Sequence, residues 1–118
     1  MIKSYKDLDV WQKSIELVKE IYKITKYFPR EEQFGLISQT RRCAVSIPSN
    51  IAEGKTRQYA NEYVQFLYVA LGSCSELETQ LIIAKELDFI KQTELDSLSE
   101  KIDHISRMIR NLIKSLRR

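Results

Sequence analysis

Glycine and proline are scarce in this sequence, with 3 glycines and 2 prolines among 118 residues. Because turns and loops depend on these two residue types, their scarcity predicts long regular elements joined by a few short connections. No apolar run approaches the roughly 20 residues of a membrane span. The first residues, MIKSYKDLDVWQK, also lack the apolar stretch of a signal peptide. We therefore expect a cytoplasmic protein with no membrane partner.

Residues that support catalysis or metal binding are equally scarce. The single histidine, His104, lies beside an apolar seam, where a solvated or rim position is expected. One histidine is too few for zinc spacing or for the paired Glu-x-x-His motifs of a di-iron bundle. The sequence has no Gly-rich phosphate loop and no Gly-x-Ser-x-Gly motif. Glu76 and Glu78 point in different directions on a helix, which favours salt bridges. We predict a protein that is not an enzyme and that holds no cofactor or metal.

The chain length predicts a single domain over residues 1–118. There is no internal repeat and no low-complexity segment. A chain of this size buries only a thin core, so association with other subunits would stabilise it. The two cysteines, Cys43 and Cys74, are expected to be small buried hydrophobic residues, because a disulfide is disfavoured in a reducing compartment.

Apolar residues recur at three- and four-residue steps along the whole chain, which is the pattern of amphipathic helices. The first predicted helix covers about residues 7–27, with Asp7 as its N-cap or Ser4 and Asp7 as a capping box. Its central stripe and flanking positions are Leu8, Trp11, Ile15, Val18 and Tyr22, then Leu17, Ile21 and Ile24.

The second predicted helix runs from Pro29 to Gly54, and its apolar period continues through Pro48. A proline inside a helix removes one backbone hydrogen bond, so we expect a kink at Pro48 without a break. The small residues around it are expected to pack against a neighbouring helix: Ser46, Ser49 and Ala52. Gly54 is the expected left-handed residue at the end of this helix.

The third predicted helix covers about residues 59–87, and Gly72 in its middle predicts close packing, since glycine costs about 1 kcal/mol there relative to alanine. The fourth has an unbroken seam typical of coiled coils: Leu95, Leu98, Ile102, Ile105, Ile109, Leu112 and Leu116. No stretch shows strand alternation. The sequence predicts an all-α fold, an antiparallel up-down-up-down four-helix bundle with its second helix kinked at Pro48.

Some apolar positions fall outside one stripe per helix, and they predict that the protein is not a monomer. They are Leu17, Ile24, Ile37, Leu67 and Ile83.

The net charge of +3 is mild, but its distribution along the chain is uneven. Residues 76–100 are mainly acidic and residues 101–118 mainly basic, a pattern of either a nucleic-acid-binding surface or helices that pair with each other. Arg41 and Arg42 are expected to meet Lys55 and Arg57 at one end of the bundle, with one arginine paired to Glu76 or Glu78. The candidate phosphate-binding residues, for which a solvated surface is the alternative, are Arg41, Arg42, Lys55, Arg57, Arg107, Arg110, Lys114, Arg117 and Arg118.

Three segments carry a resemblance to a known family: LDVWQKSIELVKEIYKIT, FPREEQFGLISQTRRCAVSIPSNIAEG and EYVQFLYVALGSCSELETQLIIAKEL. Over about residues 7–113 the chain resembles the four-helix-bundle proteins encoded in intervening sequences of bacterial large-subunit rRNA genes. The accessory variability protein of diversity-generating retroelements shares that fold. One departure is KTRQYAN, where Tyr59 replaces the serine that caps the third helix in the family.

The resemblance implies a homopentameric ring or barrel, with nucleic acid or a reverse transcriptase as a partner in the retroelement branch. Two functions follow as hypotheses. The first is a non-enzymatic oligomeric scaffold that binds RNA or DNA largely by electrostatics. The alternative is a protein–protein adaptor that docks a partner enzyme and does not contact nucleic acid.

Overall fold

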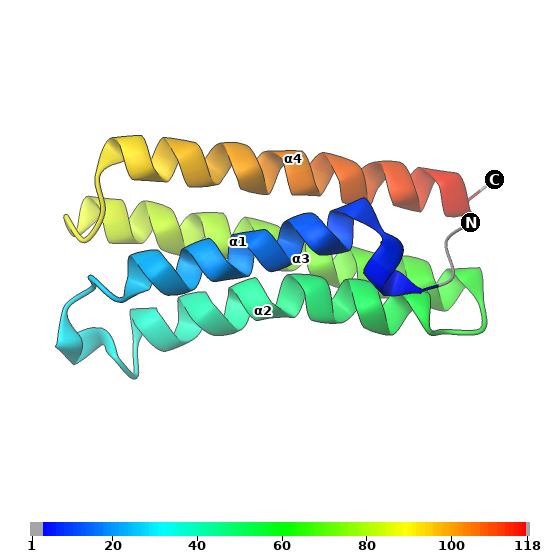
Figure 1. Ribbon diagram of the computed structural model, residues 1–118, viewed down its shortest axis with the longest axis horizontal. Coiled ribbons are helices and arrows are strands. Elements are labelled where there is room, and N and C mark those ends of the chain that lie inside the picture. Colours follow the sequence, from blue (N-terminus) through cyan, green and yellow to red (C-terminus); the bar gives the residue numbers. More distant parts are fainter. Residues whose placement is uncertain (1–3, 118) are drawn as a thin grey trace.

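The computed structural model describes residues 4–117, which contain four α-helices and no strand. Successive helices run in opposite directions along the longest axis (Figure 1). This confirms the predicted four-helix all-α fold. The helices are α1 (Asp9–Thr25), α2 (Leu36–Lys55), α3 (Ala60–Glu86) and α4 (Gln92–Leu116), with short 3-10 helices η1 (Tyr5–Asp7) and η2 (Arg30–Glu32) before α1 and α2.

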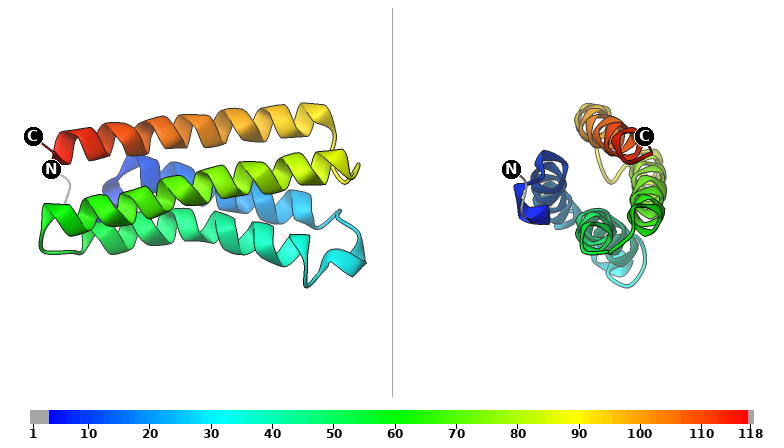
Figure 2. Two further views of the ribbon diagram at one scale, coloured as in Figure 1. Left: turned by 180° about the vertical axis from the view of Figure 1, so that it is seen from behind. Right: turned by 90° about the vertical axis from the view of Figure 1, so that its right-hand side faces the viewer.

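Each helix packs beside the next one in the sequence, and α4 returns to the side of α1 (Figure 2, right). The packing is most extensive between α2 and α3 and least extensive between α1 and α4. The seam between α1 and α4 is accordingly open to solvent along two grooves, one of them lined by His104 and by the ion pair between Lys101 and Glu20.

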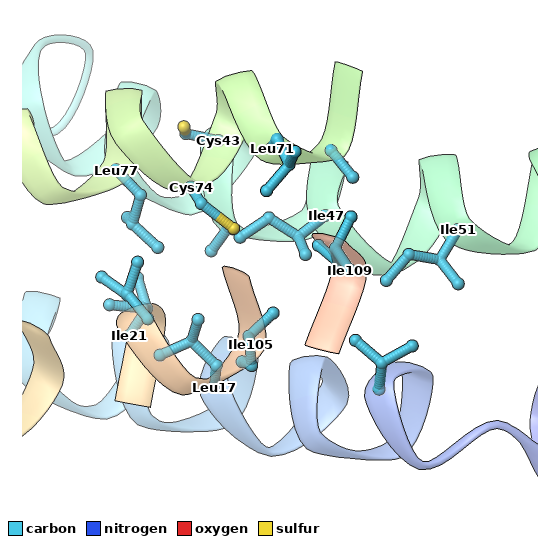
Figure 3. Packing of buried hydrophobic residues seen from close by; sticks show 14 of the residues in the cluster. Leu17, Ile21, Cys43, Ile47, Ile51, Leu71, Cys74, Leu77, Ile105 and Ile109 are labelled. Atoms are coloured by element: carbon cyan, nitrogen blue, oxygen red, sulfur yellow. The ribbon is translucent and has the colours of Figure 1, made fainter. Parts of the chain in front are cut away.

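The core is a single cluster that draws on all four helices (Figure 3). Its fully buried side chains include Leu17 of α1, Ile47 of α2, Leu77 of α3 and Ile109 of α4. The two cysteines, Cys43 and Cys74, are buried and unpaired, as expected for small hydrophobic residues. Burial of these apolar surfaces is the main term that stabilises the bundle.

Most of the predicted central stripe of the first helix lies beside its buried side, although Leu8 is buried as predicted. Trp11, Ile15 and Val18 are only half-buried and Tyr22 is 41% exposed, whereas the flanking positions Leu17 and Ile21 form the core. Both sets repeat with helical period, and periodicity alone does not say which edge of a wide apolar surface faces inward. The first helix therefore leaves an apolar edge on the outside of the bundle.

The five apolar positions predicted to remain for subunit contacts divide in the same way. Leu17 and Leu67 belong to the core, Ile24 and Ile37 are half-buried, and Ile83 is 43% exposed. Oligomerisation itself stays a prediction.

The starts of the first two α-helices differ from the prediction, and the capping hydrogen bonds lie at other positions than expected. The N-cap of α1 is Leu8, not Asp7, and Ser4 Oγ instead accepts a hydrogen bond from the Lys6 N–H at 3.2 Å to cap η1. The second helix begins at Leu36, not at Pro29, and Glu32 Oε1 accepts the Leu36 N–H at 3.0 Å. Each of these bonds satisfies a backbone donor that the start of a helix leaves free.

At the start of α4, Glu94 Oε1 accepts the Lys91 N–H at 2.8 Å, and this helix begins at Gln92, before Leu95, the first residue of the predicted seam. Its seam also shifts near the end, where Ile113 is buried and Leu112 only half-buried. A straight α-helix has 3.6 residues per turn and drifts from the 3.5-residue repeat of a coiled-coil seam, which explains the shift.

The close helix packing that the sequence predicts at Gly72 occurs at Gly54. A Cβ atom on Gly54 would lie 2.9 Å from Phe66 Cβ and 2.9 Å from Tyr63 Cδ1, both on α3. Gly54 is inside α2 and has no positive φ, so its predicted left-handed conformation is wrong. A Cβ on Gly72 would meet no atom within 4 Å.

The α2 helix continues through Pro48, as the apolar period predicts, while the kink there stays a prediction. The residues around the proline bond to each other and to α3. Ser46 Oγ and Ser73 Oγ lie 2.8 Å apart, and Asn50 Nδ2 donates to the Ser46 carbonyl at 2.8 Å. The thiol of Cys43 donates to the Ser73 carbonyl at 3.1 Å. The SIPSN segment thus joins α2 to α3.

Candidate nucleic-acid interface

Arg41 is a structural residue that ties α2 to α1. Its Nε donates to Thr25 Oγ1 at 2.8 Å, a second guanidinium nitrogen donates to the Tyr22 carbonyl at 3.3 Å, and the group lies 4.6 Å from the centre of the Tyr22 ring. One of the two arginines therefore pairs internally, as predicted, but its partners are on α1 and not Glu76 or Glu78 on α3. Two of its N–H donors are thus engaged within the protein, so Arg41 is less available for phosphate than an unbonded arginine.

Arg42 is exposed, and within residues 4–117 it donates a hydrogen bond to the neighbouring Ser38 Oγ, at 3.3 Å. The predicted cluster of Arg41 and Arg42 with Lys55 and Arg57 does not form. Arg41 and Lys55 stand near opposite ends of α2, and at 1.5 Å per residue their backbones are about 21 Å apart.

Arg57 is only partly available to a ligand. Its guanidinium bonds Glu53 at 3.0 Å and lies 4.6 Å from the centre of the Phe66 ring. Lys55 beside it is half-buried. The loop after α2 therefore presents less free positive charge than its sequence suggests.

The end of α4 presents cations without acidic neighbours. Arg110, Lys114 and Arg117 line a groove between α3 and α4, together with Tyr68 and two buried apolar residues. No acidic side chain lines this groove, and none of the three cations is in a salt bridge within residues 4–117. We call this groove the basic groove.

One tyrosine organises the basic groove. The Tyr68 hydroxyl accepts a hydrogen bond from an Arg117 guanidinium nitrogen at 3.0 Å, while the tyrosine stays partly exposed. Sequence reasoning did not assign Tyr68 to the site, since Tyr68 and Arg117 are 49 positions apart and nothing in the local sequence links them.

Two further candidate arginines are not assigned to the basic groove. Arg107 forms a salt bridge with Asp103 at 3.2 Å. Arg118, also a candidate from the sequence, lies outside the described residues.

The basic groove and the loop after α2 lie at the same end of the bundle, where α3 begins and α4 ends (Figure 1). Exposed Tyr59 sits in that loop. The structure thus brings Lys55 and Arg57 to the same end as Arg110, Lys114 and Arg117, and it places Arg41 and Arg42 elsewhere.

The buried thiols do not have the properties of nucleophiles. Burial, helped by nearby Glu76, raises the pKa of Cys43 to about 12, and burial also raises the pKa of Cys74. A thiol with a raised pKa is protonated and unreactive at neutral pH. In residues 4–117 no three His, Cys, Asp or Glu side chains gather as a metal would require, and no helix there is long and apolar enough to cross a membrane.

The fold places this protein in the class of all-α four-helix bundles. The chain belongs to the 23S rRNA-intervening sequence protein family, whose model matches residues 6–111. It is similar to a solved structure of a protein of unknown function from the S23 ribosomal protein family of Bacteroides thetaiotaomicron. That likeness has a TM-score of 0.82 and 25% sequence identity, and it covers 89% of this chain and 95% of the other. No curated protein matches the chain.

Proposed function

We propose that this protein is a non-enzymatic, oligomeric scaffold that binds the phosphate backbone of nucleic acid through the basic groove. The observation that carries the proposal is the set of three cations, Arg110, Lys114 and Arg117, which share one groove with no acidic residue. Arg117 is held in place by Tyr68, so less side-chain freedom is lost when it contacts a phosphate. Arginine suits this role because its planar fork matches phosphate oxygens.

The affinity would be mainly electrostatic. Cations that neutralise phosphates release condensed counterions, so binding falls steeply as salt concentration rises. The partly exposed ring of Tyr68 offers a surface on which an unpaired base can stack.

A homo-oligomer would repeat the basic groove once per subunit. Several weak contacts on one assembly can raise the overall affinity by orders of magnitude without any new contact. The family resemblance suggests five subunits. A reverse transcriptase or another protein is the alternative partner of such an assembly.

The test is a titration of structured RNA and of duplex DNA at low and high salt. We expect salt-dependent binding by the wild type and a loss of at least tenfold in affinity for Arg110→Glu with Lys114→Glu. The matched control is Lys26→Glu with Arg30→Glu, which makes the same change in net charge at the opposite end of the bundle. Equal losses in both variants would show that net charge, and not the groove, drives binding. Absence of binding at low salt would overturn the proposal and favour the protein adaptor.

A further inference from the structure

The basic groove has an apolar floor between its cations. Leu71 of α3 is 9% exposed and Ile113 of α4 is 5% exposed, whereas the three cations that line the groove with them are exposed. The hollow measures about 370 Å³, near the small end of ligand pockets, which span roughly 300–1,000 Å³. Phosphate alone does not account for such a site, because an anion gains nothing from contact with apolar side chains.

Tyr68 adds an aromatic wall to this floor. Tyr68 and Leu71 are three residues apart on α3, so their side chains lie on one side of the helix. The Tyr68 ring is 44% exposed, and its hydroxyl accepts the hydrogen bond from Arg117 at 3.0 Å, which restrains the direction of the ring. A tyrosine that served only the core would be buried, as Tyr63 on the same helix is.

We infer that the basic groove takes one unpaired nucleotide, with its base against the Tyr68 ring and the apolar floor and its phosphate among the cations. An unpaired nucleotide is the part of a nucleic acid that presents a planar apolar surface and a negative charge side by side. In a duplex the flat surfaces of the bases are stacked on one another, so a duplex reaches the cations but leaves the floor uncovered. This inference rests on the proposed function and names the form of nucleic acid that the groove selects.

The cations are arranged in a row that suits the backbone on either side of the bound nucleotide. Arg110, Lys114 and Arg117 follow one another at four- and three-residue steps, so they lie on one side of α4. At 1.5 Å per residue the row spans about 10 Å. A basic groove that follows the backbone, combined with an aromatic ring that receives a base, is the general design of sites for single-stranded nucleic acid.

Charge alone would give the opposite preference. A duplex carries more phosphate charge per unit length than a single strand, and its binding depends more steeply on salt concentration. The contact of a base with Tyr68 and the apolar floor releases no counterions, so it persists when salt weakens the phosphate contacts. A preference for the single strand that widens as salt rises therefore distinguishes a nucleotide pocket from a merely basic surface.

The test compares a short uridine oligomer with the same oligomer annealed to its adenosine complement, by fluorescence anisotropy at low and high salt. The wild type should bind the single strand more tightly, and the ratio of the two affinities should widen at high salt. Tyr68→Leu should lose about tenfold in affinity for the single strand and keep its affinity for the duplex within about twofold, because only the single strand has a base to stack.

Two control variants separate the ring from other effects. Tyr68→Phe keeps the aromatic ring and should keep the preference for the single strand. Tyr27→Leu removes an exposed tyrosine at the opposite end of the bundle (Figure 1) and should leave both affinities unchanged. Tyr68 is exposed, so the fold should survive its replacement, and far-ultraviolet circular dichroism checks it.

The possible failures of this inference and of the proposed function differ. Equal affinity for single strand and duplex, both reduced by Arg110→Glu with Lys114→Glu, would overturn the nucleotide pocket and leave the proposed function standing. Wild-type affinity for the single strand in Tyr68→Leu, or an equal loss for both forms, would also overturn the pocket, since the ring would then select neither form. Binding of neither form at low salt would overturn the pocket and the proposed function together.

Discussion

Arg41 and Thr25 form the hydrogen bond that links the side chains of α2 and α1. The Arg41 Nε donates to Thr25 Oγ1 at 2.8 Å, and the same hydroxyl donates to the Ile21 carbonyl at 2.7 Å. The hydroxyl is fully buried, so the arginine completes a bond that water cannot replace there. The two adjacent arginines of the sequence therefore have different roles, one structural and one exposed.

Replacement of Arg41 by lysine should destabilise the fold. Lysine lacks the planar group that bonds Thr25 and stacks on the Tyr22 ring at the same time. We expect a loss of about 1.5–3 kcal/mol in the free energy of unfolding, as for a hydrogen bond to a charged group. Urea denaturation measures it. Arg42→Lys is the control and should change stability by less than about 0.5 kcal/mol, as exposed substitutions usually do. Equal effects in the two variants would contradict a structural role for Arg41.

Alanine at the two helical glycines should have opposite effects. At Gly54 the added methyl group would lie 2.9 Å from Phe66 Cβ, which is held by the α3 backbone and yields little. We expect a net loss of roughly 1–3 kcal/mol from overpacking. At Gly72 the methyl group meets no atom, so alanine should stabilise the helix by about 1 kcal/mol. Thermal unfolding of both variants is the measurement, and a stabilised Gly54→Ala would show that the α2–α3 packing is looser than described.

The helices and their order could be predicted from the sequence because each apolar period is long and uninterrupted. The contacts between helices could not. Nothing in the local sequence indicates that Arg41 reaches α1, that Gly54 is the site of closest approach, or that Tyr68 bonds Arg117. The predicted cluster of Arg41, Arg42, Lys55 and Arg57 is wrong for a simple physical reason. A helix rises 1.5 Å per residue, so two residues of one continuous helical motif, such as Arg41 and Lys55, lie far apart along its axis.

Charge reversal in the loop after α2 should weaken nucleic-acid binding less than charge reversal in the basic groove. Arg57 is already paired with Glu53 at 3.0 Å and Lys55 is half-buried, so the variant Lys55→Glu with Arg57→Glu removes little free positive charge. Helical content and assembly should be unchanged. Fluorescence anisotropy with labelled RNA at several salt concentrations compares this variant with Arg110→Glu/Lys114→Glu. A larger loss in the loop variant would move the centre of the site to the loop.

Stability should fall at alkaline pH, in part through Cys43. Burial raises the pKa of Cys43 from 9.0 to about 12 in the folded protein. Above pH 9 the unfolded chain loses the thiol proton while the folded chain keeps it. The free energy of unfolding is therefore unaffected by Cys43 below pH 9 and falls progressively from there up to about pH 12. The slope is about 1.4 kcal/mol per pH unit.

Urea denaturation of the wild type and of Cys43→Ala at pH 8 and pH 10.5 isolates the effect of the Cys43 thiol on the free energy of unfolding. All other titrating groups are common to both proteins, so we expect the wild type to lose roughly 1–2 kcal/mol more than the variant over this interval. Parallel losses would mean that the Cys43 thiol titrates normally in the folded state.

The unequal packing around the bundle has a kinetic consequence. Three of the four helix contacts join neighbours in the sequence, and chains rich in such local contacts fold quickly. Among the four contacts between α-helices, only that between α1 and α4 joins the two ends of the described chain, and it is the least extensive one. We therefore expect the hairpin of α2 and α3 to form early in folding and the closure of α4 against α1 to come last. In reverse, we expect the native protein to open first by the parting of α1 from α4, with the other three helix contacts intact.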